Sequence, residues 1–252
     1  MPTNPAIITI DRLSPNKPGV LERLMRAYTF NSLSLQGNIT LLEQKSLGFC
    51  GSRRASDKAL RIARNCAHKA AEKDVIAVSG NAAGVDSAIH AQALQSGGST
   101  IIVLPEGIEH FRIKSALRDI WDWQRVLVIS QFPPKAPWKS YQAMARNKLI
   151  IALSQALIVI EAREKGGTLN AGMTALKNKK DLYVIEYDSD RETSKGNQIL
   201  LSNGGNKIKK SRESNEPNLE QVFQLIGDEQ GEDKQNGGPE YNQDNLPLQM
   251  AL

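Results

Sequence analysis

Short apolar runs alternate with amphipathic stretches along the chain from residue 47 onward. The runs are rich in Val and Ile and are almost uninterrupted by polar residues. They are Leu47–Cys50, Val75–Ser79, Thr100–Leu104, Val126–Ile129, Ala156–Glu161 and Leu182–Glu186. Near-continuous hydrophobicity of this kind is typical of parallel strands that are covered on both faces. The pattern therefore predicts six strands of a buried parallel sheet.

The segments between these runs have helical spacing. In Asp57–Glu72, four apolar residues recur every three or four positions and form one face of a helix: Leu60, Ala63, Ala67 and Ala70. Further helices are predicted at Val85–Leu94, Tyr141–Ser154, Leu169–Lys177 and Leu219–Leu225. Strands that alternate with helices predict the α/β class, here a Rossmann-like parallel sheet flanked by helices.

The composition divides the chain into three parts. Residues 1–45 contain four prolines and a short helical pattern near Leu21–Tyr28, and we interpret them as an N-terminal appendage to which no fold is assigned. Residues 46–226 form the Rossmann-like domain. Residues 227–252 are dominated by Gly, Asn, Gln, Asp and Pro, which predicts a disordered acidic tail.

The overall composition narrows the class of protein. Apolar residues make up 40% of the 252 residues and charged residues 23%, as in ordinary soluble globular proteins. The apolar runs are too short to cross a membrane, and no secretory signal begins the chain. Two cysteines and three scattered histidines support neither a disulfide framework nor a zinc site. We expect a cytoplasmic protein with no membrane segment and no metal.

The net charge of +5 is unevenly distributed. Residues 227–252 carry six acids and one base, a net charge of −5, which leaves +10 on residues 1–226. A basic body suits a polyanionic ligand, because cationic surface attracts phosphate over about one Debye length. A solvated surface with surplus lysine gives the same balance, so charge alone does not decide the ligand.

Three glycine-rich loops follow predicted strands, at the strand ends where open parallel sheets bind ligands. Their candidate phosphate-binding residues are Gly51, Ser52 and Arg53, then Ser79, Gly80, Asn81, Gly84 and Asp86, and finally Gly166, Gly167 and Thr168. Each loop can present backbone N–H groups at a helix N-terminus, and glycine lets an anion approach them. Ordinary tight turns also use glycine. The motifs of a dinucleotide-binding loop and of a P-loop are absent, which argues against a standard NAD enzyme and a P-loop ATPase.

Several side chains near these loops have candidate roles. The planar fork of Arg53 suits a phosphate or a base. We interpret Asp86 as a residue that orients the second loop, and His90 as a packing residue rather than a general base. Glu161 ends a predicted strand before the third loop, where its carboxylate would bond a ribose hydroxyl or hold the loop.

The segment from Lys139 to Lys148 combines basic residues with Tyr141, and Trp138 precedes it. Aromatic side chains beside a basic groove hold single-stranded nucleic acid through base stacking. The candidate binding residues of this segment are Lys139, Arg146, Asn147 and Lys148. An exposed helix with partly buried aromatics is the alternative.

These motifs, in this order, resemble the DNA-processing protein A family, DprA, also called Smf. The matching residues share their order and spacing with that family over about residues 47–205. They are Gly51-Ser52-Arg53, Ser79-Gly80-x-Ala82-x-Gly84-x-Asp86-x-x-x-His90, Gly98-x-Thr100-Ile101-x-Val103-Leu104, Arg146-Asn147-Lys148-x-Ile150-x-Ala152-Leu153-Ser154, Glu161-Ala162, Gly166-x-x-Leu169 and Gly196-Asn197-x-x-Leu200-Leu201.

The resemblance implies a function for the domain. Members of the family bind and protect single-stranded DNA, form dimers through this core, help load the recombinase RecA, and are not known for a catalytic step. By resemblance, Arg53 contacts a phosphate, the Ser79–Asp86 loop and Arg146-Asn147-Lys148 line the same groove, and Lys139 lies near a DNA-contacting position. We therefore predict a homodimeric single-stranded DNA-binding protein without a cofactor, in DNA uptake, recombination or phage defence.

Some residues depart from the family pattern. Ala143-Met144 stand where relatives have Phe-Pro, so a base would stack on Tyr141 or Trp138 instead. Lys148 replaces a second arginine, which keeps the charge but loses the fork. We expect neither the N-terminal helical domain nor the winged helix of the family. RecA loading is therefore not expected to accompany strand binding.

Related Rossmann-like domains provide a second hypothesis. Some bind or sense nucleotides, and others are nucleotide phosphoribohydrolases. Gly166-Gly167-Thr168 resembles the loop of those hydrolases only in part, because Asn170 and Ala171 occupy the region of their glutamate. A nucleotide-binding or nucleotide-sensing domain is thus the alternative to strand binding, and we assign no catalytic residue.

Overall fold

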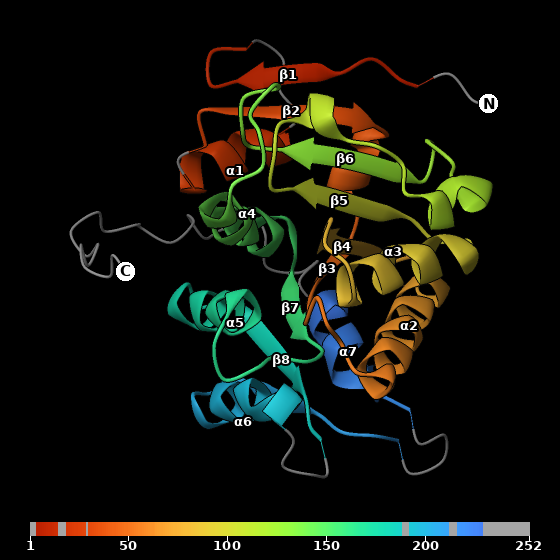
Figure 1. Ribbon diagram of the computed structural model, residues 1–252, viewed down its shortest axis with the longest axis vertical. Coiled ribbons are helices and arrows are strands. Elements are labelled where there is room, and N and C mark those ends of the chain that lie inside the picture. Colours follow the sequence, from red (N-terminus) through yellow and green to blue (C-terminus); the bar gives the residue numbers. More distant parts are fainter. Residues whose placement is uncertain (1–3, 15–18, 29, 188–191, 212–215, 229–252) are drawn as a thin grey trace.

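The computed structural model describes residues 4–14, 19–28, 30–187, 192–211 and 216–228. Within these residues one nine-stranded sheet runs through the molecule, in the order β1-β2-β6-β5-β4-β3-β7-β8-β9 (Figure 1). The strands are β1 (Ile8–Asp11), β2 (Ser32–Gly37), β3 (Ser46–Cys50), β4 (Ile76–Gly80), β5 (Thr100–Leu104), β6 (Val126–Ser130), β7 (Ala156–Val159), β8 (Asp181–Ile185) and β9 (Asn206–Ile208).

The strands from β3 to β9 pair in parallel, which confirms the predicted fold class. Each of the six predicted strands is present, with ends that differ by no more than two residues from the predicted ones. All five residues of β3, β4, β5 and β6 are buried, as the near-continuous apolar runs imply.

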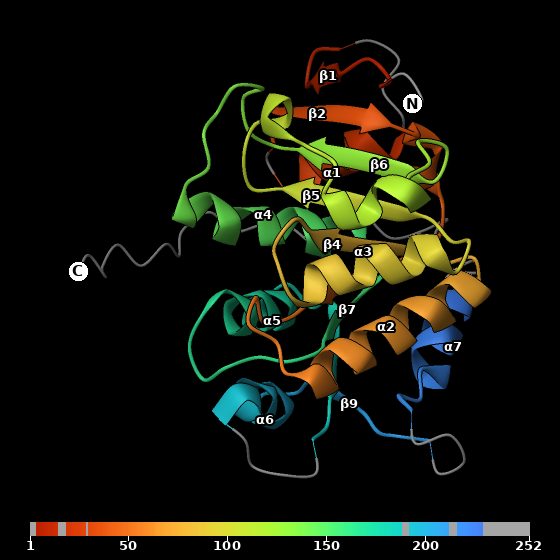
Figure 2. The same ribbon diagram turned by 45° about the vertical axis from the view of Figure 1, so that its right-hand side comes forward.

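Helices cover both faces of the sheet (Figures 1 and 2). They are α1 (Gly19–Tyr28), α2 (Asp57–Glu72), α3 (Val85–Gln95), α4 (Ser140–Leu153), α5 (Gly167–Lys177), α6 (Lys195–Ser202) and α7 (Glu220–Asp228). Buried residues of α1, α4, α5 and α6 share one apolar cluster with the sheet. Those of α2, α3 and α7 share the cluster on the opposite face. The core is therefore two apolar layers separated by the sheet.

The first 45 residues contribute to the sheet. β1 and β2 form an antiparallel hairpin, and β2 continues the sheet through antiparallel pairing with β6. Leu33 and Leu35 of β2 are buried, and so are Leu21, Leu24 and Met25 of α1. The segment interpreted as an appendage without an assigned fold thus packs into the core. Of the tail expected to be disordered, residues 229–252 lie outside the described residues.

The order of the strands creates a switch point between β3 and β7. The chain leaves β3 toward α2 on one face of the sheet, whereas it leaves β7 toward α5 on the other face. Adjacent parallel strands whose connections diverge in this way open a crevice beyond their carboxyl ends. The loops after β3, β4 and β7 meet at this crevice.

Candidate functional site

A cavity of about 300 Å³ lies at the switch point. We call it the rim cavity, and its walls come from the loop after β3 (loop 1, residues 51–56), the loop after β4 (loop 2, residues 81–84), the loop after β7 (loop 3, residues 160–166) and α4. The lining residues are Cys50, Gly51, Ser52, Arg53, Ala82, Asp86, Ser140, Ala143, Met144, Arg146, Asn147, Ile150, Arg163, Lys165, Gly166, Gly167 and Thr168. The structure therefore brings the three glycine-rich loops together.

Loops 1 and 2 are packed against each other. A Cβ atom at Gly51 would overlap the side chain of Val85, and one at Gly84 would overlap the carbonyl oxygen of Ser52. Gly84 also has a φ of +72°, in the region that favours glycine. The Val85 N–H donates to the Ser52 carbonyl at 3.2 Å. The glycines of these two loops thus permit contact within the protein.

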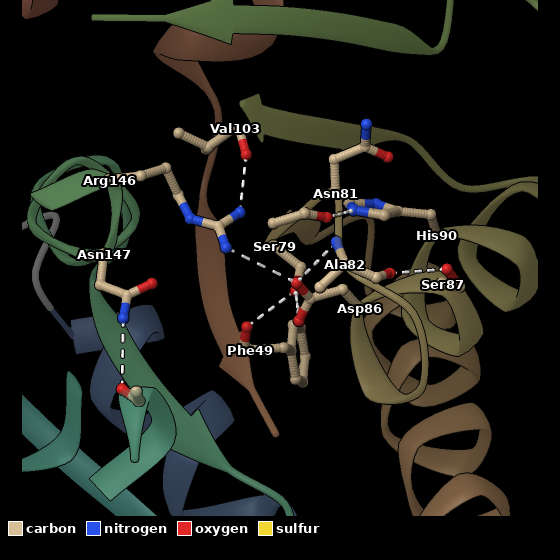
Figure 3. Close-up of polar contacts among 12 residues, drawn as sticks. Phe49, Ser79, Asn81, Ala82, Asp86, Ser87, His90, Val103, Arg146 and Asn147 are labelled. Atoms are coloured by element: carbon tan, nitrogen blue, oxygen red, sulfur yellow. Dashed lines mark hydrogen bonds and ion pairs between the residues drawn. The ribbon is translucent and has the colours of Figure 1, made fainter. Parts of the chain in front are cut away.

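A buried ion pair between Arg146 of α4 and Asp86 of α3 supports loop 2 (Figure 3). Arg146 of α4 is 5% exposed, donates to the Val103 carbonyl at 2.7 Å, and lies 3.9 Å from the Asp86 carboxylate. Its guanidinium occupies the space that a Cβ atom at Gly80 would need. Arg146 lines the rim cavity, where its two terminal nitrogens face Val103 and Asp86, while its Nε has no hydrogen-bond partner among the described residues.

Asp86 orients loop 2. Its carboxylate accepts a hydrogen bond from the Ala82 N–H at 3.2 Å and lies 3.1 Å from the Ser79 hydroxyl (Figure 3). Lys114, which the sequence did not single out, donates to the carbonyls of Asn81 and Ala82 at 3.0 Å. Burial lowers the pKa of Lys114. The arrangement matches the orienting role predicted for Asp86, and it uses Ser79 and Asn81 for the same purpose.

His90 is a neutral structural residue. Its Nε2 donates to the Gly80 carbonyl at 2.7 Å, and its Nδ1 lies 2.7 Å from the Thr100 hydroxyl. Burial lowers the pKa of His90 to about 4. The ring is 1% exposed and does not line the rim cavity, so it packs and hydrogen-bonds as the sequence predicted.

Glu161 holds loop 1. Its carboxylate accepts hydrogen bonds from the Ser56 hydroxyl at 2.6 Å and the Ser56 N–H at 3.1 Å, while its backbone carbonyl accepts from the Ser52 N–H at 2.9 Å. Ser56 in turn caps α2. Glu161 is 1% exposed. Of the two roles left open by the sequence, the geometry corresponds to holding the loop rather than contacting a ribose.

Loop 3 leads into the N-terminus of α5 and leaves open space. No atom lies within 4 Å of the position that a Cβ would take at Gly166 or at Gly167. Asn147 of α4 donates to the Gly167 carbonyl at 3.3 Å and joins α4 to this end of α5. The backbone N–H groups of the first turn of α5 are the site's best candidates for an anion, because the helix dipole also favours negative charge there.

Three cations of the rim cavity remain exposed: Arg53, Arg163 and Lys165. Within the described part of the chain, none of the three forms an ion pair. The sequence singled out only Arg53. The other two could have been found because they lie between Glu161 and Gly166, at the same strand end as a glycine loop.

Exposed aromatic side chains border the cavity. Trp138 is 50% exposed and Tyr141 62% exposed. The guanidinium of Arg53 lies 5.9 Å from the centre of the Trp138 ring, and the ammonium of Lys139 lies 5.9 Å from that of Tyr141. Cations over aromatic faces attract the ring at such distances. Loop 1 and the segment before α4 are thereby linked in one surface.

The structure separates the candidate residues into two groups. The rim cavity includes Gly51, Ser52, Arg53, Asp86, Arg146, Asn147, Gly166, Gly167 and Thr168. Ser79, Gly80, Asn81, Gly84, Lys139, Lys148 and Glu161 do not line it. Of this second group only Lys139 and Lys148 are exposed, and they lie on the surface of the α4 region. The others support the loops.

Among the described residues, no helix is long and apolar enough to span a membrane. No group of three or more His, Cys, Asp or Glu side chains there has the arrangement of a metal site.

The mostly parallel sheet, its switch-point cavity and its glycine-rich loops define a Rossmann-like α/β protein. The chain belongs to the DNA recombination-mediator protein A family, whose sequence model matches residues 12–217. This match confirms the resemblance to DprA and Smf that the ordered motifs indicated.

Relatives and solved structures agree with this membership. The chain is 30% identical over 174 residues to the DNA processing protein DprA of Streptococcus pneumoniae, covering 68% of this chain and 61% of the relative. A crystal structure of DprA from that organism superposes with a TM-score of 0.69 at 27% identity, covering 80% of this chain and 71% of the other. DNA processing protein A of Helicobacter pylori, at 22% identity and a TM-score of 0.69, covers 88% and 95% and shares the fold.

The chain spans 47% to 61% of the length of three curated relatives, from S. pneumoniae, Bacillus subtilis and Escherichia coli.

Proposed function

We propose that this protein binds single-stranded DNA in the rim cavity. One observation carries the proposal: the open glycine floor at the N-terminus of α5 lies in the same cavity as three exposed cations that form no ion pair with any residue the structure describes. Backbone N–H groups and guanidinium groups are the donors that bind phosphate oxygens. The aromatic rings beside the cavity supply the faces on which unpaired bases stack.

Each part of the site has its own task in this proposal. Arg53, Arg163 and Lys165 attract and hold the phosphates, and the first turn of α5 accepts one of them on its N–H groups. Trp138 and Tyr141 stack on the bases and replace the Phe-Pro of relatives. Arg146, Asp86, His90 and Glu161 keep the loops in place through their hydrogen bonds and through the ion pair of Arg146 with Asp86.

The relatives support the nucleic-acid ligand. The similar proteins from S. pneumoniae and B. subtilis are DNA processing proteins, and the structural work on the H. pylori protein concerns its mode of binding single-stranded DNA. By extension we propose a role in DNA processing for this chain, as a homodimer. Light scattering at several protein concentrations tests the dimer. RecA loading is not expected of this chain, and a pull-down with a RecA-type recombinase tests that expectation.

A nucleotide-binding domain is the competing function, since a cavity of about 300 Å³ is also large enough for a mononucleotide. Salt dependence separates the two. A strand that neutralises several phosphates binds with a log–log salt slope of roughly −0.7 per phosphate. A mononucleotide in a single pocket binds with a slope near one such contact. Titrations with single-stranded DNA, double-stranded DNA, RNA and mononucleotides at several salt concentrations give the answer, and a shallow slope for every ligand would reject strand binding.

Arg53 provides the sharpest single test. Arg53→Ala is expected to weaken binding of single-stranded DNA by about 1–3 kcal/mol, because a charge-assisted contact is lost. Arg53→Lys is expected to recover part of the loss, since it restores the charge without the fork. Arg118→Ala removes an exposed arginine outside the rim cavity and is the matched control. Equal affinities of Arg53→Ala and the control would remove Arg53 from the site.

A further inference from the structure

A second cleft lies beyond the carboxyl ends of β8 and β9. Its volume is about 240 Å³, and its walls come from the first half of α2 and from the segments that follow these two strands. Figure 2 shows the beginning of α2 close to β9. The lining residues are Lys58, Arg61, Ile62, Asn65, Ile185, Glu186, Ile208, Lys209, Lys210 and Pro217. We call it the basic cleft.

The basic cleft is strongly cationic. Four of its lining residues are basic and one, Glu186, is acidic. Glu186 lies 3.5 Å from Lys207, which neutralises it from outside the lining. Within the described residues, Arg61 and Lys209 form no ion pair. Like charges from two distant segments repel one another, and an anion placed between them removes that repulsion.

The basic cleft and the rim cavity lie at the same end of the sheet, beyond the carboxyl ends of its parallel strands. Loop 1, which carries Arg53, runs directly into α2, which carries Lys58 and Arg61. In the sheet, β7 and β8 separate β3 from β9. Three inter-strand steps correspond to about 14 Å, a span of only a few nucleotides of an extended strand. One ligand can therefore reach from one site to the other.

We propose that the basic cleft is a second phosphate-binding site, which holds the backbone of the DNA strand whose bases and phosphates occupy the rim cavity. This inference rests on the proposed function. The cleft offers charge above an apolar floor of Ile62, Ile185 and Ile208. The ring of Tyr187 lies beside it, with the Lys58 ammonium 5.2 Å from the ring centre. It contacts phosphates rather than bases, so it lengthens the bound strand without adding sequence preference.

Oligonucleotide length tests the second site. The protein is titrated with homopolymeric single strands of about 2 nucleotides, too short to reach from one site to the other, and of about 20 nucleotides, longer than the usual footprint of a single-strand-binding domain. The double variant Arg61→Ala/Lys209→Ala is expected to bind the long strand roughly tenfold more weakly than wild type, with a salt slope shallower by about 1.4. Its affinity for the short strand is expected to be unchanged.

The control is the double variant Lys73→Ala/Lys177→Ala. Both lysines are exposed at the C-terminal ends of α2 and α5, hence at the opposite edge of the sheet, and the variant has the same net charge as the test variant. Far-UV circular dichroism and urea unfolding check that both variants fold. Because Arg61 and Lys209 are exposed, neither substitution disturbs the core.

The outcomes separate this inference from the proposed function. Loss that is confined to the long strand and absent from the control supports the basic cleft. A test variant that binds both strands like wild type, or loses affinity equally for both, overturns the second site while the rim cavity stands. If the wild-type protein binds neither strand, the proposed function fails and the inference falls with it.

Discussion

Two sets of glycines lie on the same rim of the sheet, and they do different things. At Gly51, Gly80 and Gly84 the space for a side chain is filled by the protein's own atoms. At Gly166 and Gly167 nothing lies within 4 Å of that position. The first set lets loops 1 and 2 pack as a wall, and the second leaves backbone accessible to a ligand. A glycine-rich loop after a strand is therefore ambiguous until its surroundings are known.

Arg53 and Arg146 differ in the same way as the two sets of glycines, one being open to solvent and the other packed within the protein. Both belong to motifs that the sequence assigned to phosphate binding, and both line the rim cavity. Arg53 is exposed and lies over Trp138, whereas Arg146 is buried and bonded to Val103 and Asp86. Under the proposed function Arg53 contacts the ligand, whereas Arg146 holds the loops beside it in place.

Removal of Arg146 should have the largest effect on stability. Arg146→Ala leaves the Asp86 carboxylate buried without its counter-charge, so the free energy of unfolding should fall by about 3–5 kcal/mol. Arg53→Ala should leave it unchanged within about 0.5 kcal/mol, since surface substitutions rarely matter more. Urea denaturation measures both. A loss below about 1 kcal/mol for Arg146→Ala would contradict the wall that we describe.

The buried residues that support the loops are tested by the pH dependence of the free energy of unfolding, to which His90 contributes. Its pKa is lowered by burial from 6.5 to about 4, so the unfolded chain binds more protons between these values. Stability from this residue is complete above about pH 6.5 and is lost as the pH falls toward 4, by about 3 kcal/mol at pH 4.

The non-titrating variant His90→Gln isolates this contribution. Denaturation curves from pH 7 to pH 4.5 should show a steeper loss of stability for the wild type than for the variant. Parallel pH profiles would mean that His90 titrates normally in the folded protein, against its burial and its two hydrogen bonds.

Substitution of Trp138 tests the exposed part of the proposed binding site. Trp138→Ala should weaken binding of single-stranded DNA by about 1–3 kcal/mol, the usual cost of one lost base stack, and leave stability almost unchanged. Trp138→Phe should keep most of the affinity, because it keeps an aromatic face. Fluorescence anisotropy with a labelled strand measures both. Equal affinities of the Ala and Phe variants would show that no base stacks there.

The smallest expected effect is that of Gly167→Ala, and its comparison with Gly51→Ala tests the difference between the two sets of glycines. Gly167→Ala places a methyl group in open space at the start of α5, so stability should stay equal or rise by up to about 1 kcal/mol. Strand affinity should fall by less than about 1 kcal/mol as the methyl group crowds the phosphate. Gly51→Ala should instead destabilise the fold by about 1–3 kcal/mol through overlap with Val85. Calorimetric unfolding of both variants separates ligand-facing from packing glycines.

The sequence predicted the inner sheet because its strands are buried on both faces and read as unbroken apolar runs. The edge strands β1 and β9 were missed for the same reason, since their exposed residues interrupt the pattern. β2 was missed although Leu33 and Leu35 alternate with polar residues, because the prolines before it suggested irregular structure. The helix α6 is only eight residues long and carries Gly196, which weakens its helical pattern.

The site was predictable in position but not in detail. Strand ends and glycine spacing located the loops, and the order of the motifs indicated the family. The division between contact and support depends on burial, which arises from tertiary packing and has no local signal. Glu161 and Arg146 look like ligand-binding residues in the sequence, yet their partners Ser56 and Val103 are distant in the chain. Arg163 and Lys165 were overlooked although they adjoin a recognised motif.

The interlocking of loops 1 and 2 has an evolutionary consequence. The side chain of Val85, directly after loop 2, fills the space beside Gly51, and the backbone of loop 1 fills the space beside Gly84, so an insertion or a larger residue in one loop displaces its neighbour. The two can change only in concert. Loop 3 is restricted in the same way at Arg163, whose carbonyl fills the space beside Gly196, whereas its end at Gly166 and Gly167 leaves room for substitutions.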